Sequence, residues 1–247
     1  MKVQHEFSGK NVFITGAASG IGRAQAVEFL KNGANVYGFD VDQAGLTSLA
    51  ECYDGFRFTA GSVRNHADVL EAVTQAGDID ILCNTAGVLD GFAKTLETDE
   101  ALWDRIMDTN CKGMFLVTNA VLPKMLERKS GVVVNMASIA GLVAGGGGAA
   151  YTASKHAVIG YTKQLSMDYC REGIRANAIA PGAIQTPMNA ADFAGDGDMA
   201  KWVADETPAG RWAQPEEVAK LTLYLASNAA SYIHGSVIPI DGGWTAK

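Results

Sequence analysis

Seven short β-rich runs recur along the chain, and each but the last leads into a helix-like stretch or a loop before one. The runs lie at Asn11–Thr15, Asn35–Asp40, Phe56–Ala60, Asp78–Cys83, Gly131–Ala137, Arg175–Ala180 and Ser236–Ile240. Such alternation predicts βαβ units, whose strands pair in parallel. Several runs are apolar almost without alternation, as expected where helices cover both faces of a sheet. We therefore expect an α/β fold with a doubly wound, parallel, seven-stranded sheet and helices on both faces.

Helix-like patterns separate these runs. Apolar residues recur at three- and four-residue spacing in Ile21–Leu30, Leu102–Met125 and Ala153–Tyr169, which suits helices that pack on a sheet. No Pro/Gly/Ser-rich linker or run of charges divides the chain, so we expect residues 1–247 to form a single domain. In Asn189–Ala213, glycines and a proline interrupt a short amphipathic piece at Met199–Val203. We expect a mobile, lid-like insertion at about residues 188–213.

The composition argues against several classes of partner. Hydrophobic residues make up 48% of the chain and charged residues 19%, which is typical of a soluble globular protein. The net charge of −7 disfavours nucleic-acid binding, because phosphates require a concentrated basic surface. No apolar stretch reaches membrane-spanning length, and the segment Met1–Gly9 is polar and charged. We expect a cytoplasmic protein with small-molecule partners and no membrane partner.

The cysteines give no sign of a metal site or a disulfide framework. Cys52, Cys83, Cys111 and Cys170 lack CxxC spacing and do not cluster with the four histidines. Buried, reduced thiols are therefore the expected state, and no metal is predicted.

A glycine-rich turn follows the first β-rich run and leads directly into a helical pattern. The turn contains Gly16, Gly20 and Gly22, with Ser19 and Ile21 between the glycines. Such a turn lets the backbone approach a pyrophosphate, and the unpaired N–H groups at the helix start stabilise its negative charge. Glycines at this spacing are often only a tight turn, but their position between a strand and a helix favours a dinucleotide site.

The residue at the end of the second β-rich run indicates which dinucleotide, NAD or NADP, would bind. Asp40 stands about where such a site places a carboxylate on the adenosine ribose. A carboxylate there accepts hydrogen bonds from both ribose hydroxyls and repels a 2′-phosphate, and Ser19 brings no charge that would neutralise that phosphate. The pattern therefore predicts NAD (NADH) rather than NADP as the cofactor. The competing interpretation is that Asp40 only caps a helix or turn, which is common for Asp at strand ends.

Tyr151 and Lys155 are candidate catalytic residues. They lie four residues apart in a helical pattern, which puts both side chains on one face. A phenol is a poor base at neutral pH, but a neighbouring cation and an oxidised nicotinamide ring would both lower its pKa. Tyr151 would then donate a proton during reduction and remove one during oxidation. An isolated Tyr-x-x-x-Lys pair is usually an ordinary helix surface, so the rest of the site carries the interpretation.

Two further residues complete this constellation. Ser138, after the run Gly131–Ala137, would hold the substrate oxygen by a hydrogen bond that strengthens as charge develops. Lys155 would also bind the nicotinamide ribose. Asn110 would hold a water that relays protons from Lys155 to solvent.

Taken together, these motifs resemble the short-chain dehydrogenase/reductase family, which has a single-domain Rossmann fold. The resemblance covers essentially the whole chain and rests on TGAASGIG at 15–22, NTAG at 84–87, Asn110, Ser138, YTASK at 151–155, Pro181-Gly182 with Thr186, and DGG at 241–243. It implies an NAD-dependent enzyme acting on CH–OH groups. It also implies a homotetramer, built through the long helical patterns and the C-terminal strand region.

The resemblance also implies further cofactor contacts, at Ser62, Val63, Asn84, Ala86, Gly87, Pro181, Gly182, Ile184 and Thr186. The chain departs from the family at two places. Thr85 stands where a second asparagine is common, and Ser62 where an aspartate commonly faces adenine. Neither departure touches the chemistry, but the second bears on adenine affinity.

The loops that follow the strands limit the substrate mainly through the side chains that they lack. Gly145–Gly148 supplies little bulk and no charge, and no arginine there offers to bind a carboxylate. Met188, Phe193 and Trp202 could close over a substrate or pack the insertion on the body, and for Trp212 packing is favoured.

The leading hypothesis is an NAD(H)-dependent oxidoreductase that interconverts a secondary alcohol and a ketone. One alternative is reduction of a 3-oxoacyl thioester of an acyl carrier protein, although such reductases typically use NADPH. A hydroxy-acid dehydrogenase fits the cofactor but requires a cationic anchor that the sequence does not supply. A non-catalytic NAD-binding sensor is the alternative of a different class, and the presence of both Tyr151 and Lys155 argues against it.

Overall fold

A seven-stranded, wholly parallel sheet forms the centre of the computed structural model, which describes residues 6–247. Its strand order is β3-β2-β1-β4-β5-β6-β7. The strands are β1 (Asn11–Thr15), β2 (Asn35–Asp40), β3 (Phe56–Ala60), β4 (Ile81–Asn84), β5 (Gly131–Met136), β6 (Ile174–Pro181) and β7 (Val237–Ile240). The predicted fold class is thereby confirmed.

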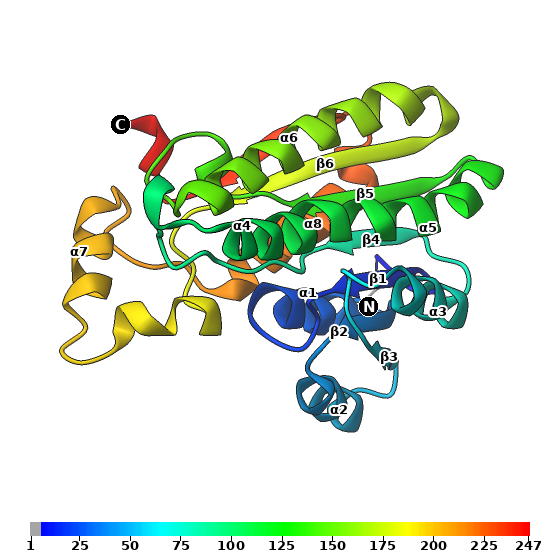
Figure 1. Ribbon diagram of the computed structural model, residues 1–247. Coiled ribbons are helices and arrows are strands. Elements are labelled where there is room, and N and C mark those ends of the chain that lie inside the picture. The colour runs from blue at the N-terminus through cyan, green and yellow to red at the C-terminus, as the bar shows by residue number, and fades with distance from the viewer. Residues whose placement is uncertain (1–5) are drawn as a thin grey trace.

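Eight α-helices in the described part of the chain cover the two faces of this sheet (Figure 1). They are α1 (Gly20–Lys31), α2 (Gln43–Cys52), α3 (His66–Ala76), α4 (Glu100–Met107), α5 (Met114–Glu127), α6 (Ala149–Tyr169), α7 (Asp198–Glu206) and α8 (Pro215–Ala226). The helix α7 lies to one side of the layered body, close to the C-terminus (Figure 1). No helix among residues 6–247 is both long and apolar enough to cross a bilayer.

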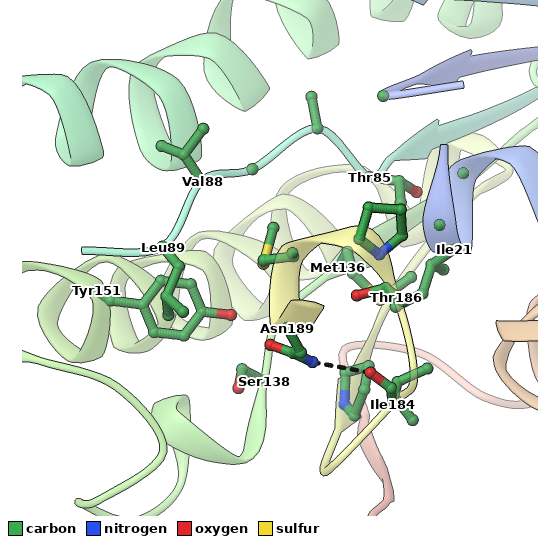
Figure 2. A pocket seen from close by; sticks show the side chains of 18 of the residues that line it. Ile21, Thr85, Val88, Leu89, Met136, Ser138, Tyr151, Ile184, Thr186 and Asn189 are labelled. Carbon is green, nitrogen blue, oxygen red and sulfur yellow. Dashed lines mark hydrogen bonds between the residues drawn. The ribbon is translucent and has the colours of Figure 1, made fainter. Parts of the chain in front are cut away.

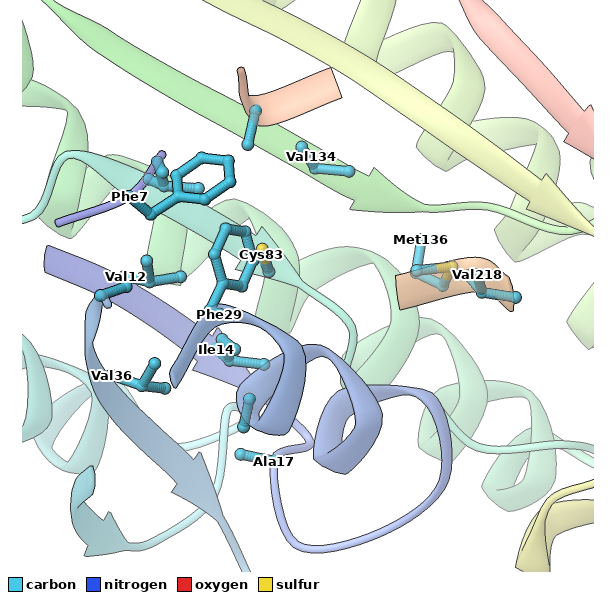
Figure 3. Packing of buried hydrophobic residues seen from close by; sticks show 14 of the residues in the cluster. Phe7, Val12, Ile14, Ala17, Phe29, Val36, Cys83, Val134, Met136 and Val218 are labelled. Atoms are coloured by element: carbon cyan, nitrogen blue, oxygen red, sulfur yellow. The ribbon is translucent and has the colours of Figure 1, made fainter. Parts of the chain in front are cut away.

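Two main hydrophobic cores lie on opposite faces of the sheet. On one face, Phe29 of α1 packs over β1 and β2, and Val218 of α8 lies beside Met136 of β5 in the same cluster (Figure 3). On the other face, Val117 of α5 and Leu165 of α6 belong to the second cluster, which also includes α3. Burial on both faces explains why the strands read as continuous apolar runs.

The fourth strand begins later than its β-rich run predicts, at Ile81 instead of Asp78. The Asp78 carboxylate pairs with Arg128 at 3.3 Å, and the Asp80 carboxylate accepts a 2.9 Å hydrogen bond from the backbone N–H of Asn11. The side chains of both acidic residues thus fix the segment that precedes β4.

The helical pattern Leu102–Met125 is not one helix. A π-helical turn at Asp108–Gly113 separates α4 from α5. Such turns insert an extra residue and often occur at functional sites. Here the turn contains Asn110, whose buried side chain hydrogen-bonds Val88 and Ser154, a tertiary arrangement that three- and four-residue periodicity does not encode.

The order of the strands fixes where a ligand can bind. β1 pairs with β2 on one side and with β4 on the other, so the chain reverses its direction of winding at β1. In open α/β sheets, ligands bind beyond the carboxyl ends of the strands at such a switch point.

Candidate active site

A cavity of about 700 Å³ opens at this carboxyl edge of the sheet (Figure 2). All but two of the site residues predicted from the sequence line it. Those in the lining are Gly16, Ser19, Gly20, Ile21, Gly22, Asp40, Ser62, Val63, Ala86, Gly87, Ser138, Tyr151, Lys155, Pro181, Gly182, Ile184 and Thr186. The two that lie outside the lining are Asn84 and Asn110.

The glycine-rich turn is packed too closely for side chains. Gly16 has a φ of +71°, and a Cβ there would lie 2.9 Å from the Cα of Ala86. A Cβ on Gly22 would overlap the carbonyl oxygen of Gly16. Ser19 precedes α1 without capping it through its side chain, and the first turn of α1 has no acidic residue. The N–H groups at this helix start therefore suit a pyrophosphate, and the residues present fit a dinucleotide.

Asp40 is held at the edge of the same cavity. One carboxylate oxygen accepts a hydrogen bond from the backbone N–H of Ala18 and the other from that of Asp42, both at 3.0 Å. The helix α2 has its own cap, because the Asp42 side chain accepts a hydrogen bond from the N–H of Gly45. Asp42 and not Asp40 caps the helix, whereas the bond from the Asp42 N–H makes Asp40 a turn residue that also lines the cavity.

Ser62 and Val63 line the cavity just after β3, whose last residue Ala60 pairs with Asp40. The N–H of Ser62 donates to Asp68 at 2.9 Å, and its hydroxyl accepts from the N–H of Arg64 at 3.2 Å. Arg64 also lines the cavity, and its guanidinium pairs with Asp108 at 3.6 Å. No sequence motif singles out Arg64, which lies just outside the family pattern.

Tyr151, Lys155 and Ser138 come together as the spacing predicts. The first two lie on α6, and the Lys155 ammonium is 5.4 Å from the centre of the Tyr151 ring. The Lys155 Nζ donates to the carbonyl oxygen of Met136 at 2.8 Å, which holds it at the end of β5. The Ser138 hydroxyl accepts a hydrogen bond from the N–H of Ala140 at 3.1 Å, and its side chain faces the cavity together with that of Tyr151 (Figure 2).

Burial dominates the ionisation of this pair. It raises the pKa of Tyr151 to about 12, although a hydrogen bond with Ser138 acts in the opposite direction. It lowers the pKa of Lys155 to about 8, because the ammonium loses most of its hydration. The expected lowering of the Tyr151 pKa by the neighbouring cation is not found here, because burial raises this pKa.

The two asparagines outside the lining belong to buried networks. Asn84 donates to Thr118 at 3.0 Å and to Asn135 at 2.9 Å, so its side chain joins β4 to β5 and α5. Asn110 lies beside the cavity wall, since a Cβ on Gly87 would be 3.3 Å from its Oδ1 and 3.6 Å from the Nζ of Lys155. The fold thus brings Asn110 near Lys155 across Gly87.

Thr85 fills the place of the second asparagine of the family motif. Its hydroxyl donates to Gln25 of α1 at 2.6 Å, and its backbone N–H donates to Thr15 at 3.0 Å. The loop after β4 is therefore fastened to both β1 and α1.

The lid-like insertion contributes a wall of the cavity. Met188 and Trp202 line it, whereas Phe193 packs against Trp212 with ring centres 4.9 Å apart. Trp212 lines the cavity and also holds the insertion together, because its indole N–H donates to the carbonyl of Ala200 at 2.8 Å.

The four consecutive glycines divide into two pairs. Gly145 and Gly146 line the cavity, as their lack of bulk predicts. A Cβ on Gly147 would overlap the Tyr151 ring, and one on Gly148 would overlap the backbone of Ala93. The second pair therefore allows neighbouring segments to approach the start of α6.

Sequence reasoning missed Asp90 and Trp244. Asp90 is 5% exposed, and its carboxylate accepts hydrogen bonds from backbone N–H groups at the start of α6. Trp244 reaches the cavity from the C-terminal tail. Neither position carries a local motif. Within residues 6–247 there is also no group of three His, Cys, Asp or Glu side chains arranged to hold a metal ion.

Comparison with known proteins agrees with this geometry. A family model described as enoyl-(acyl carrier protein) reductase matches residues 16–245. Dehydrogenase/reductase SDR family member 6 of Rattus norvegicus is 37% identical, over 96% of this chain and 98% of its own. The chain belongs to the short-chain dehydrogenase/reductase family. As a member of this family, the protein is an oxidoreductase that acts on CH–OH groups.

Other relatives of this short-chain dehydrogenase/reductase differ in their named substrates and bound cofactors. The 3beta-hydroxysteroid dehydrogenase 2 of Eggerthella lenta is 38% identical, over 97% of this chain and 96% of its own. A 3-oxoacyl-[acyl-carrier protein] reductase from Brucella melitensis, solved with bound NAD, has a TM-score of 0.89 at 32% identity and covers 98% and 93% of the two chains. A Beutenbergia cavernae structure with NADP at low occupancy has a TM-score of 0.91 at 33% identity and covers 99% and 100%.

Proposed function

We propose that this protein interconverts a secondary alcohol and a ketone with NAD(H) as cofactor and Tyr151 as the acid/base. The observation that carries the proposal is the approach of Tyr151, Lys155 and Ser138 at the end of a cavity whose other end contains the glycine turn and Asp40. One cavity lined by both sets of residues supports proton transfer and dinucleotide binding at a single site.

Each of the four catalytic candidates has a distinct task. The Tyr151 hydroxyl gives its proton to the substrate oxygen during reduction and takes the hydroxyl proton during oxidation. Ser138 donates a hydrogen bond to that oxygen, which strengthens as negative charge develops. The Lys155 ammonium stabilises the phenolate form and holds the nicotinamide ribose, and Asn110 holds a water beside it. Bound NAD(H) supplies or accepts the hydride.

The preference for NAD(H) rests on charge. Asp40 lines the end of the cavity that we assign to adenosine, where its carboxylate would accept hydrogen bonds from ribose hydroxyls and repel a 2′-phosphate. The first turn of α1 presents its N–H groups to the pyrophosphate. Arg64 is the one cation at this end of the described lining, and its pairing with Asp108 reduces its availability to a phosphate.

The Tyr151→Phe variant tests the mechanism. We expect it to bind NADH nearly as the unaltered protein does, because the phenyl ring keeps its packing, and to lose turnover by about three orders of magnitude. NADH binding followed by fluorescence and turnover followed by NADH absorbance measure the two effects. Substantial residual turnover in this variant would show that another group transfers the proton, and loss of NADH binding would show that the Tyr151 hydroxyl is needed to bind the cofactor.

Reduction of a 3-oxoacyl thioester is the second candidate. The resemblance to the Brucella melitensis reductase favours it, and the NAD bound there removes the cofactor argument against this class. A direct assay with an acetoacetyl thioester and NADH separates the two candidates.

We also propose a cytoplasmic homotetramer with a lid at about residues 188–213. The four cysteines are unpaired thiols, which suits a reducing compartment. Trp103 of α4, Phe115 of α5 and Met167 of α6 are exposed apolar residues on the helices that would meet in the tetramer. Sedimentation velocity of the Phe115→Glu variant tests this assembly, and an unchanged sedimentation coefficient would argue against it.

A further inference from the structure

Large apolar side chains gather, uncovered, around the mouth of the cavity. Phe92, Met188, Met199 and Trp202 all line it, and their exposed fractions are 51%, 47%, 54% and 54%. We call these four residues the apolar rim. Large exposed apolar side chains gathered at one cavity are typical of a binding site in a soluble protein. The rim continues the site that contains Tyr151, so its natural occupant is the part of the substrate that extends beyond the reacting oxygen.

Two further tryptophans line the cavity together with Trp202 of the rim. Trp202 comes from α7, Trp212 from the segment before α8 and Trp244 from the C-terminal tail. Three of the four tryptophans of the chain therefore meet at one cavity. Trp212 is anchored by its bond to the Ala200 carbonyl, and the Lys247 ammonium lies 4.3 Å from the centre of the Trp244 ring. Anchored aromatic faces offer a large apolar contact area.

The charges in the cavity lining are few and are unevenly placed. Four charged residues in the described chain line it, and two of them, Asp40 and Arg64, lie at the adenosine end. Lys155 donates to the Met136 carbonyl beside Tyr151. Of these four, Asp192 on the lid segment is left for the part of the substrate beyond the reacting oxygen.

The two basic residues of the lid do not offer a positive charge to the cavity. Lys201 pairs with Asp198 at 3.3 Å, and Arg211 pairs with Glu217 at 2.7 Å. Neither of these basic residues lines the cavity. A substrate carboxylate or phosphate would therefore lose its hydration among apolar side chains, find no cation among the described lid residues and meet a carboxylate.

We infer that the substrate is an uncharged, bulky and mostly apolar alcohol or ketone, and that Asp192 excludes anionic compounds. This substrate class rests on the proposed function, because it assumes that Tyr151 and NAD(H) perform the reaction. A small hydroxy acid fits neither the apolar rim nor Asp192. An uncharged ring compound that reaches from Tyr151 to the rim would contact the apolar side chains and would not be repelled by Asp192.

Two alcohols with the same carbon skeleton test the claim that Asp192 excludes anionic substrates. We expect NAD⁺-linked oxidation of methyl 4-hydroxycyclohexanecarboxylate to exceed that of the free carboxylate by roughly tenfold in kcat/KM, from one like-charge contact at the partly exposed Asp192. The Asp192→Asn variant should narrow this ratio. The control is Asp205→Asn, which removes the same charge from an exposed position of α7 outside the lining and should leave the ratio unchanged.

The bulk half is tested with cyclohexanol and 4-tert-butylcyclohexanol. Burial of the added methyl groups against the rim should raise kcat/KM by roughly tenfold. Trp202→Ala should reduce this advantage by shortening the apolar wall, and the ratio of the two alcohols cancels any general loss of activity. Equal kcat/KM values for the two alcohols in the unaltered enzyme would overturn the bulk requirement.

The outcomes separate the substrate class from the proposed function. Faster oxidation of the carboxylate than of its ester, or an ester-to-acid ratio that Asp192→Asn leaves unchanged, overturns the inference while the proposed function stands. Oxidation of lactate without oxidation of any ring alcohol likewise overturns the substrate class alone. Absence of hydride transfer from every alcohol to NAD⁺ or NADP⁺ overturns both.

Discussion

The Asp90 carboxylate accepts hydrogen bonds from the backbone N–H groups of Tyr151 and Gly148, both at 2.8 Å, although 61 and 58 residues separate them in sequence. Gly148 is the residue before α6 and has no side chain with which to cap it. Asp90 therefore caps the catalytic helix from the loop after β4. Its negative charge also suits the positive end of the helix dipole.

This relationship predicts a specific effect of Asp90→Asn. The amide has one acceptor oxygen in place of two, and its NH₂ group would face a backbone N–H. We expect a loss of about 2 kcal/mol in the free energy of unfolding, since two buried charge-assisted hydrogen bonds are disturbed. We also expect kcat to fall, because the backbone of Tyr151 is one of the two donors. Urea unfolding and steady-state kinetics measure the two effects.

Asp99→Asn is the matched control for this variant. Asp99 also caps a helix, accepting a 2.8 Å hydrogen bond from the N–H of Leu102 at the start of α4, but in an exposed position. We expect a loss below about 1 kcal/mol and an unchanged kcat. Equal effects of the two substitutions would show that Asp90 is an ordinary cap with no special bearing on Tyr151.

A second prediction follows from the pKa of Lys155, which burial lowers to about 8 from its ordinary value of 10.5. Between these two pH values the unfolded chain binds a proton that the folded chain has released, so the ammonium opposes folding below pH 8 and this effect fades as the pH rises. Lys155→Met removes the group. We expect its stability advantage over the unaltered protein to shrink by on the order of 3 kcal/mol as the pH rises from 7 to 10.

Denaturant unfolding of both proteins across this pH range checks that prediction. Packing differences between lysine and methionine do not change with pH, so only the pH-dependent part of the difference is interpreted. A constant difference would mean that the folded protein leaves the Lys155 pKa near its ordinary value. Tyr151 has the opposite effect, but only above pH 10, because its raised pKa of about 12 makes stability fall as the pH rises from 10 to 12.

A third prediction concerns the choice of cofactor. Asp40→Asn keeps the size of the side chain and removes the charge that repels a 2′-phosphate. The amide can accept only one of the two backbone hydrogen bonds, so the ratio of the two cofactors is compared and not the activity with either one. We expect the ratio of kcat/KM for NADH to that for NADPH to fall by roughly tenfold or more. Asp42→Asn is the control, since Asp42 caps α2 and lies outside the cavity lining. Comparable efficiency with NADH and NADPH in the unaltered enzyme would contradict the proposed preference at once.

Much of the fold could be predicted because its signals are local. Three strands, β1, β2 and β3, have the bounds that their β-rich runs predict. The glycine turn is required by contacts within a few residues, as the overlap of a Gly22 side chain with the Gly16 carbonyl shows. Tyr151 and Lys155 meet because helical geometry places residues four apart on one face.

Other parts of the site depend on segments that only folding brings together. Asn84 reads as a cofactor contact in its motif, yet its side chain turns to Thr118 and Asn135 between two strands and a helix. The apparent single helix Leu102–Met125 contains a π-helical turn whose Asn110 bonds to Val88 and Ser154. Local periodicity does not contain these partners.

The sequence by itself determined the parallel sheet, the glycine turn and the pairing of Tyr151 with Lys155, because strand pattern, backbone sterics and helical spacing act over a few residues. The tertiary structure alone decided that Asp90 caps α6 and that Trp244 meets Trp202 at one cavity. The role of a buried carboxylate or of an aromatic residue in a cavity wall depends on partners that are distant in the chain. Those partners are set by how the layers of the fold pack.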